Sequence, residues 1–316
     1  MPVRFRKAVC IYNPVSGAGA SSDAIADIRT SLRAGVERVE LAPTGGPGHA
    51  SALARDAVRA DADLVAVLGG DGTANEVVQG LAGTESASLL VLPGGTANVL
   101  VNEVGMPRDP AQAAEMLPRL QRRAVRLGNV QFEGGGSRYF LLMCGAGLDA
   151  EISARTSTAL KNRWGQGAFW LQGVGQVFRP CPRLQIDGEG PHGRQALCLV
   201  VVSKSRQYGG GLVFSPEASL LADQFEVVRF SGSNRIRHAA YLLAIALQAS
   251  ARCPGIARDM RSDLRLVPAG GRSVKLQVDG EVAGELPARV CFSSVSLNVM
   301  LPPEYGGAGP AGGSEA

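Results

Sequence analysis

The segment Gly69–Glu76, with the sequence GGDGTANE, carries the residues best suited to chemistry in this chain. It directly follows the apolar run LVAVL, and Gly69, Gly70 and Gly72 remove side chains where a strand should meet a helix, so that a ligand can approach the backbone. Backbone amides at such a turn bind phosphate, but Asp71 would repel it unless Mg²⁺ or ordered water lies between them. The turn therefore predicts binding of a metal–nucleotide rather than a bare anion.

Part of the same turn has a purely structural explanation. Thr73 and Glu76 match a capping box, in which Thr73 caps the N-terminus of the following helix and Glu76 reaches back to it. This pattern accounts for both residues without a ligand. It leaves the three glycines and Asp71 unexplained, and those four residues carry the functional prediction.

Two further turns have related compositions. Residues 93–98, PGGTAN, repeat the pattern after the next apolar run, and Thr96 and Asn98 would add neutral donors to the same crevice. Residues 13–21, NPVSGAGAS, follow the first apolar run with small residues that let an anion reach a helix N-terminus. The sequence contains no GxxxxGK[ST] motif, which excludes a P-loop.

Apolar runs indicate the elements that must position these turns. Over the first ~130 residues, runs rich in Val, Leu and Ile alternate with segments of helical period, which is typical of parallel strands buried on both faces. Turns at the carboxyl ends of such strands share one crevice, where open α/β sheets bind ligands. After Arg126, shorter runs separated by turns predict a mainly antiparallel second domain.

Composition and charge narrow the function classes. The net charge of +4 is too small to indicate a nucleic-acid-binding protein. The six cysteines form no CxxC pair, and most lie in apolar runs, as buried free thiols in a reducing cytosol do. The first apolar run is too short for a signal peptide, and the most apolar internal stretch is about half the ~20 residues that span a bilayer. We expect a soluble, cytoplasmic protein.

NPxSG, GGDGTxNE and PxGTxN together resemble the motifs of the diacylglycerol kinase catalytic family, which includes sphingosine and ceramide kinases and bacterial soluble lipid kinases. GGDGT alone also occurs in NAD kinases and phosphofructokinases, but the Asn-Glu after it and the downstream motifs make the lipid-kinase resemblance specific. It spans residues 8 to 301. Its further motifs are GAGLDAEI at 145–152, KNRWGQGAFW at 161–170, YGGGLVFSPEA at 208–218 and DGE at 279–281.

The resemblance implies an α/β fold: a Rossmann-like (NAD kinase/diacylglycerol kinase-like) N-terminal domain and a mainly antiparallel β-sandwich second domain, with the active site in the cleft between them. The expected divisions are a nucleotide-binding domain at 1–127, completed by about 293–305, a lipid-substrate domain at 128–292 and a disordered tail at 306–316. The implied nucleotide contacts are Asn13, Pro14, Val15, Ser16, Gly17, Thr44, Gly70, Asp71, Gly72, Thr73, Ala74, Asn75, Glu76 and Thr96.

The general base implied by the resemblance is the Glu of a DGE motif, and the sequence contains two, at 187–189 and 279–281. Asp-Gly between apolar residues is also a strong hairpin signal, so at least one copy is expected to be only a turn. We choose Glu281, because its motif follows LQV and lies near the C-terminus, as the family requires. Glu281 is predicted to accept the proton of the attacking hydroxyl, and Asp71 is the second predicted catalytic residue.

The sequence departs from the family at its structural Mg²⁺ site. The family often carries Asp-Gly after PxA, whereas SPEASLLADQ places Ala222 at the Asp and Asp223 at the Gly. Either Asp223 holds the ion after a shift of one residue, or the ion is absent.

Two features point toward the lipid. Position in the family implies that Asp149 recognises the lipid headgroup, whereas a role as a turn or capping residue explains it equally well. The glycines around Asp149 also resemble a dinucleotide-binding fingerprint, but the acidic residue that such a site needs about 20 residues later is missing. Trp164 and Trp170 lie near Lys161 and Arg179. Aromatic and basic residues together can seat a helix in a membrane interface, although such a stripe is more often core.

These observations predict a cytoplasmic, peripherally membrane-associated kinase that transfers the γ-phosphate of ATP, with Mg²⁺, to the hydroxyl of a diacylglycerol-like lipid. The alternatives are a kinase of sphingosine or another long-chain base, an NAD kinase, and a non-catalytic nucleotide-binding regulator. The expected partner is the lipid substrate at a membrane surface and not nucleic acid; a homo-oligomer is possible.

Overall fold

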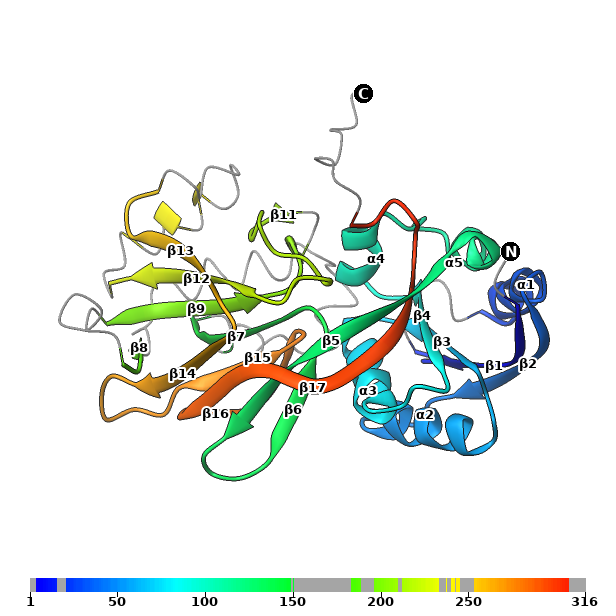
Figure 1. Cartoon of the computed structure of the whole chain (residues 1–316), viewed down its shortest axis with the longest axis horizontal. Coiled ribbons are helices and arrows are strands. Elements are labelled where there is room, and N and C mark those ends of the chain that lie inside the picture. The colour runs from blue at the N-terminus through cyan, green and yellow to red at the C-terminus, as the bar shows by residue number, and fades with distance from the viewer. Residues whose placement is uncertain are drawn as a thin grey trace.

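The computed structural model shows an α/β part and a β-rich part that lie side by side (Figure 1). Trp164, Trp170 and the expected tail beyond residue 306 lie outside the described residues. The structure describes residues 4–15, 21–148, 150, 183–188, 196–209, 212–232, 237, 240–241, 243–244 and 253–306.

A parallel sheet forms the centre of the α/β part. Its strands are β1 (Phe5–Tyr12), β2 (Val36–Pro43), β3 (Leu64–Gly69) and β4 (Ser88–Pro93). They pair in the order β4-β3-β1-β2, all parallel. All six residues of β3 are buried. The uninterrupted apolar runs of the sequence are thus strands of a sheet that is covered on both faces.

The helices that accompany this sheet are α1 (Ser22–Leu32), α2 (His49–Arg59), α3 (Asp71–Leu81), α4 (Val99–Val104), α5 (Pro110–Glu115) and a 3-10 turn at Leu117–Arg119. The pair α1 and α5 packs on one face of the sheet, and the pair α2 and α3 packs on the other (Figure 1). Each of α3 and α4 directly follows a strand, so their N-termini lie at the carboxyl edge of the sheet. That edge is where the glycine-rich turns are found.

The β-rich part is mainly antiparallel. Its inner faces bury a core that includes Phe140, Val200, Phe225 and Leu276, and the rings of Phe225 and Phe292 stack with centroids 3.9 Å apart. The strands are β5 (Gln121–Phe132), β6 (Ser137–Phe140), β7 (Met143–Gly147), β8 (Leu184–Ile186), β9 (Leu197–Ser203), β10 (Gln207–Gly209), β11 (Leu212–Val213), β12 (Phe225–Ser231), β13 (Ile256–Arg261), β14 (Asp263–Pro268), β15 (Lys275–Val278), β16 (Glu281–Glu285) and β17 (Ala288–Leu301).

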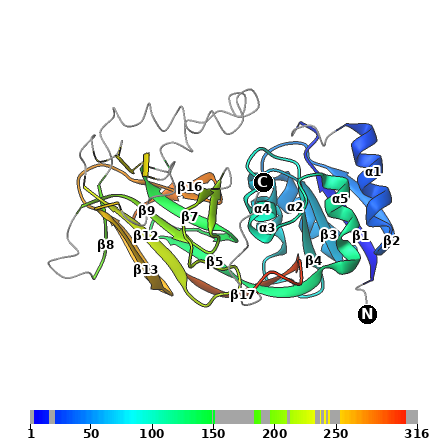
Figure 2. The same cartoon turned by 90° about the horizontal axis from the view of Figure 1, so that it is seen from above.

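Two long strands join the parts. β5 and β17 pair antiparallel from Ala288 opposite Phe132 to Leu301 opposite Gln121, and β17 also pairs parallel with β4 through Asn298 and Val299. Figure 2 shows both strands running from one part to the other. β5 crosses residue 127 and β17 crosses residue 293, so the expected division points fall inside continuous strands. The division into two domains at these residues stays a prediction.

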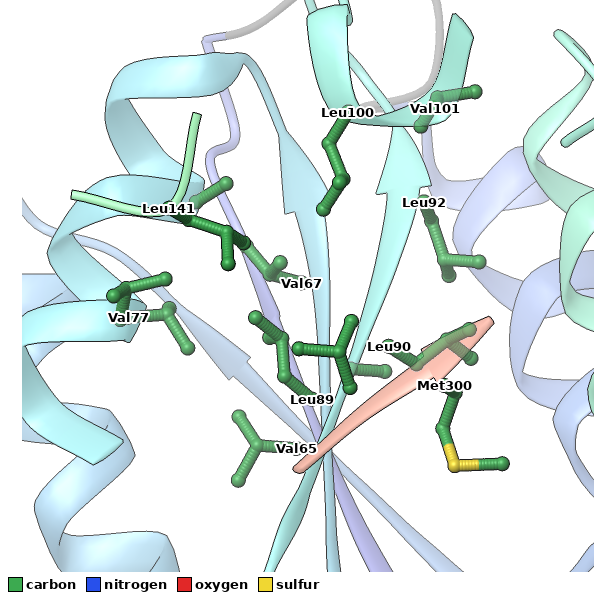
Figure 3. Packing of buried hydrophobic residues seen from close by; sticks show 14 of the residues in the cluster. Val65, Val67, Val77, Leu89, Leu90, Leu92, Leu100, Val101, Leu141 and Met300 are labelled. Atoms are coloured by element: carbon green, nitrogen blue, oxygen red, sulfur yellow. The ribbon is translucent and has the colours of Figure 1, made fainter. Parts of the chain in front are cut away.

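The core under the parallel sheet takes side chains from distant segments. Met300 of β17 and Leu141 of the β6–β7 turn join Val65, Leu89 and Leu90 in one cluster (Figure 3). The mixed α/β architecture with an antiparallel β part confirms the fold class predicted from the sequence. In the part of the chain that the structure describes, no helix is long and apolar enough to cross a membrane.

Candidate functional site

The two glycine-rich turns touch each other. β3 and β4 are adjacent and parallel, with Gly69 opposite Pro93. A Cβ added to Gly94 would lie 2.7 Å from Gly69 N, and one added to Gly95 would lie 3.1 Å from Gly70 N and closer still to Gly70 Cα. A side chain at Gly94 or Gly95 would therefore force the two turns apart, whereas a Cβ on Gly70 would lie 3.5 Å from Gly95 Cα, an ordinary contact.

The ends of β1 and β2 meet the same edge of the sheet. Asn13 N–H donates to Leu68 O at 3.2 Å, and Thr44 N–H donates to Tyr12 O at 2.8 Å. Asn13 Oδ1 in turn accepts from Val15 N–H at 3.1 Å. Pro14, Val15 and Thr96 are exposed, and Thr44 is half-buried. Ser16 and Gly17, the remaining predicted contacts of the first turn, lie outside the described residues.

The capping box predicted for Thr73 and Glu76 is wrong. α3 begins at Asp71, with Gly70 as its N-cap, and Thr73 lies inside the first turn, against Gly69. Glu76 instead caps the N-terminus of the neighbouring helix α2. Its Oε1 accepts from Gly48 N–H at 2.7 Å, and its Oε2 accepts from Ala50 N–H at 3.1 Å. The reason is that the helix starts three residues earlier than the pattern assumes, which places Glu76 too far along α3 to reach its own N-terminus.

Asp71 connects the two glycine turns. Its Oδ1 accepts from the N–H of Val99, the first residue of α4, at 2.7 Å. Asn98, the N-cap of α4, uses its side chain within its own turn, accepting from Gly95 N–H and donating to Gly95 O, each at 2.8 Å. Burial raises the pKa of Asp71 to about 6, and the hydrogen bond from Val99 opposes this shift. The nearby carboxylate of Asp279 adds to the increase.

Asp279, to which the sequence assigned no role beyond the hairpin turn, ties α3 to the β-rich part. This buried side chain accepts from Leu142 N–H at 3.0 Å and Met143 N–H at 2.9 Å through Oδ1. Through Oδ2 it accepts from Leu141 N–H at 3.0 Å and from the Asn75 side-chain amide at 2.8 Å. Burial raises the pKa of Asp279, against the effect of these donors. Its backbone φ of 45° fits the Asp-Gly turn that was recognised as a hairpin signal.

Glu281, the predicted base, lies against the first turn of α3. A Cβ on Gly72 would be 3.1 Å from Glu281 Cδ and under 3.0 Å from Oε1. The other oxygen, Oε2, is 3.5 Å from an Arg138 guanidinium nitrogen. Arg138 also donates to Asn75 Oδ1, at 3.3 Å from Nε and 3.1 Å from Nη2. Arg138 is a second residue that the sequence did not single out, and no local motif marks it.

The other DGE motif lies elsewhere. Asp187 follows β8, at the end of the β-rich part remote from the glycine turns (Figure 1), and forms an exposed ion pair with Arg265. Its Oδ1 accepts from Gly188 N–H at 3.0 Å. Glu189 lies outside the described residues. Between the two copies, the one at 279–281 is thus the one beside the glycine turns.

A second junction between the parts is built on Glu103 of α4. This buried carboxylate accepts from Ser205 Oγ at 3.0 Å, Arg206 Nε at 3.0 Å and Gln207 N–H at 3.1 Å. It also accepts from Tyr305 Oη at 3.1 Å. Burial, with the Glu103 charge beside it, raises the pKa of Tyr305 to about 12. The junction fixes α4, and with it the second glycine turn, to the β-rich part and the C-terminal segment.

The predicted metal residue, Asp223, belongs to no metal-binding cluster among the described residues. The Asp223 side chain is 84% exposed and pairs with Arg126 at 3.4 Å. Within the described ranges, no three His, Cys, Asp or Glu side chains form a group that could hold a metal ion. Asp149, predicted to recognise the lipid headgroup, lies outside the described residues.

Comparison with known families gives two matches that divide the chain. Residues 7–130 match the diacylglycerol kinase catalytic domain, and residues 143–301 match the YegS C-terminal NAD kinase beta sandwich-like domain. The diacylglycerol kinase of Bacillus subtilis (strain 168) is 28% identical over 312 residues, covering 95% of this chain and 97% of its own. A probable YegS-like lipid kinase of Pseudomonas fluorescens is 31% identical over 220 residues, covering 69% of this chain and 70% of its own.

Solved structures agree on the fold. A putative diacylglycerol kinase from Bacillus anthracis str. Sterne superposes with a TM-score of 0.77 at 21% identity, covering 96% of this chain and 98% of that chain. Yeast NADH kinase complexed with NADH gives a TM-score of 0.52 at 14% identity, covering 96% of this chain and 85% of that chain. At these identities the likeness concerns the fold alone.

Proposed function

Because the chain belongs to the diacylglycerol kinase catalytic family, and is a lipid kinase, we propose that it transfers the γ-phosphate of ATP to the hydroxyl of a diacylglycerol-like lipid. The observation that carries the proposal is the position of Glu281. Its carboxylate comes from the β-rich part, yet lies against Gly72 in the first turn of α3. A base at that place could meet a hydroxyl that approaches a phosphate bound at the glycine turns.

We place the triphosphate along the carboxyl edge of the parallel sheet. The bare contact between Gly70 and Gly95 lets phosphate oxygens reach backbone amides, and the N-terminus of α3 favours negative charge there. The proposed contacts are those implied by the sequence: Asn13, Pro14, Val15, Ser16, Gly17, Thr44, Gly70, Asp71, Gly72, Thr73, Ala74, Asn75, Glu76 and Thr96. Asn75 and Glu76 act indirectly. The Asn75 side chain is hydrogen-bonded to Arg138 and Asp279, and the Glu76 carboxylate accepts from the N-terminus of α2.

The residues present fit a Mg²⁺ ion that is held largely by the nucleotide. In kinase sites Mg²⁺ keeps several waters and takes one or two carboxylates together with substrate phosphates, so a preformed cluster of three protein ligands is not required. Asp71 is the carboxylate at the two turns, and would hold the ion directly or through water. When bound, Mg²⁺ would neutralise charge on the phosphates during transfer.

The protein groups then have separate tasks. Glu281 accepts the proton of the lipid hydroxyl, whose oxygen forms a bond to the γ-phosphorus as the bond to the β-phosphate oxygen breaks. Arg138 positions Glu281 by its ion pair and links it to Asn75. Asp279 fixes the backbone two residues before Glu281. Phosphoryl transfer depends mainly on such positioning and on charge neutralisation, not on covalent chemistry.

We further propose that Asp149 contacts the lipid headgroup and that the segment with Trp164 and Trp170 touches the membrane surface. The support is the sequence pattern, because these residues lie outside the described ranges. Co-sedimentation with anionic liposomes tests the membrane contact, and neutral liposomes provide the comparison. Failure to bind either kind would contradict it.

Transfer of ³²P from γ-labelled ATP to a panel of acceptors tests the function. Mixed micelles of diacylglycerol, ceramide or sphingosine, and NAD in a separate reaction, are offered to the purified chain with Mg²⁺. We expect label in the phosphorylated diacylglycerol, and its loss in Glu281→Gln and without Mg²⁺. Label only in sphingosine or in NAD would assign one of the alternative substrates, and label in none would refute the proposal.

A further inference from the structure

Lys204 follows β9 and is a completely buried lysine, with 0% of its surface exposed. The chain has only four lysines, at 7, 161, 204 and 275, among 32 basic residues. Lysine is almost never buried unless its charge is compensated. The Lys204 ammonium therefore needs a structural explanation, which its partners supply.

Backbone carbonyl groups and an aromatic ring surround the ammonium. Lys204 Nζ donates to Arg126 O at 2.7 Å and to Leu220 O at 2.9 Å. It also lies 5.0 Å from the centroid of the Phe292 ring, within the range of a cation–π contact. Carbonyl oxygens are ligands that hard metal cations also take. The ammonium thus connects β5, β17 and the segment before β12 as a bound cation would.

This is the segment in which the family's structural Mg²⁺ was expected. Leu220 lies two residues before Ala222 and three before Asp223, the two positions weighed for that ion. Asp223 pairs with the side chain of Arg126, whose carbonyl oxygen accepts from Lys204. The Leu220 N–H is itself held by Tyr305 Oη at 3.2 Å. The backbone of Leu220 and both the carbonyl group and the side chain of Arg126 thus make the contacts that hold this segment in place.

The residues at the expected metal position do not fit Mg²⁺. Ala222 has no side-chain oxygen, and the Asp223 carboxylate is 84% exposed and paired with Arg126. Mg²⁺ demands near-octahedral oxygen ligation, usually with at least one carboxylate. The Leu220 carbonyl, which could be a ligand, already accepts from the Lys204 ammonium.

We propose that Lys204 is the built-in cation of this segment: its ammonium takes the carbonyl oxygens that a structural metal ion would otherwise hold, and the β-rich part is stable without metal. A lysine cation is covalently attached, so it cannot be removed by a chelator. Dependence on Mg²⁺ would then be confined to the nucleotide. This inference does not rest on the proposed lipid substrate.

The charge of Lys204 sets the pH for the test. Burial lowers the pKa of Lys204 to about 7, and the neighbouring Arg126 charge adds to this effect, against the attraction of Asp223 and Asp279. At pH 6.5 most molecules carry the ammonium. Above that pH the neutral amine can still donate hydrogen bonds to both carbonyl groups.

The first test measures metal in the wild-type chain at pH 6.5, without nucleotide. We expect the same Tm in EDTA and in excess Mg²⁺, and no stoichiometric metal by mass spectrometry after gel filtration. A Tm that falls in EDTA, or one tightly bound Mg²⁺ or Ca²⁺ per chain, would overturn the proposal. This measurement uses the wild-type chain, so it tests the proposal even if substitutions at Lys204 prevent folding.

The second test removes the Lys204 ammonium and, in a double variant, adds a carboxylate that could bind Mg²⁺ in its place. Lys204→Met removes the donor that the ammonium supplies to the Arg126 and Leu220 carbonyl groups and should lower Tm by roughly 5–10 °C. Lys7→Met is the matched control, because Lys7 Nζ also donates to a carbonyl, Ala60 O at 3.1 Å, but near the surface. The double variant Lys204→Gln/Ala222→Asp should gain a Tm that rises with Mg²⁺. Equal losses for both single variants, or no response of the double variant to Mg²⁺, would count against the assignment.

Discussion

Replacing Gly72 by alanine should separate folding from catalysis. Gly72 lies in the first turn of α3 with no positive φ, so alanine fits the backbone and should stabilise the helix by about 0.5–1 kcal/mol. The added Cβ would lie 3.1 Å from Glu281 Cδ and under 3.0 Å from Oε1, closer than real Cβ atoms come. The Glu281 side chain is 46% exposed, so the carboxylate and not the helix is expected to move.

The size of the effect follows from that displacement. The carboxylate must retreat by roughly 1 Å, and a misplacement of this size at a reacting group can cost about 10²-fold. A general base contributes about 10²–10⁴-fold, so the loss of its position should lower kcat by about 100-fold. We expect this fall in the ³²P-transfer assay, together with an unchanged or slightly higher Tm.

Gly134→Ala is the matched control. Gly134 also lacks a positive φ, and no atom lies within 4 Å of its added Cβ, so both kcat and Tm should stay near the wild-type values. A Gly72→Ala chain with normal kcat and normal Tm would refute the reasoning. It would mean that the carboxylate beside Gly72 is not where the reaction needs a base.

Four other substitutions, one of them a control outside the site, test its remaining parts. Because burial raises the pKa of Asp71 to about 6, its ionised form is lost as the pH falls; kcat/KM should drop about tenfold by pH 5. Asp71→Asn, which keeps an oxygen for Val99 N–H, should be folded but nearly inactive throughout; a flat wild-type profile from pH 5 to 7 would contradict the role. Asp279→Asn removes a buried charge that accepts four hydrogen bonds and should cost about 2–3 kcal/mol in urea unfolding. Asp187→Asn, in the exposed DGE copy, should cost under about 0.5 kcal/mol, and equal losses would disprove the distinction. Glu76→Ala removes the acceptor at the start of α2 and should lower stability by about 1 kcal/mol in thermal unfolding. Weaker ATP binding without that loss would instead favour direct contact with the nucleotide.

The sequence predicted the α/β part well because its signals are local. The run LVAVL has no polar alternation, and β3 is indeed buried along its full length. The glycines of the second turn meet a steric demand: Gly94 and Gly95 approach the backbone of Gly69 and Gly70 too closely for a side chain. Such a requirement can be recognised in the sequence, because only glycine meets it.

The capping box fails for the opposite reason. Thr73 and Glu76 satisfy the spacing rule, but the rule contains no information about neighbouring helices. α2 presents free N–H groups at Gly48 and Ala50, and Glu76 is the carboxylate within reach. Asp71 is used in the same way by α4. The N-termini of α2 and α4 are thus satisfied by side chains of α3, and only the tertiary structure shows this.

The DGE motif shows how far a motif can specify a site. Its Glu is the residue to which the family resemblance assigns the chemistry, but its Asp makes the contacts that place it. Asp279 accepts from Leu141, Leu142 and Met143, more than 130 residues earlier, and from Asn75, 204 residues earlier. Asn75 in turn accepts from Arg138, which pairs with Glu281. The carboxylate proposed as the base is therefore held from both sides by residues that no local pattern connects to it, which is why two identical motifs in one chain can differ completely in what they do.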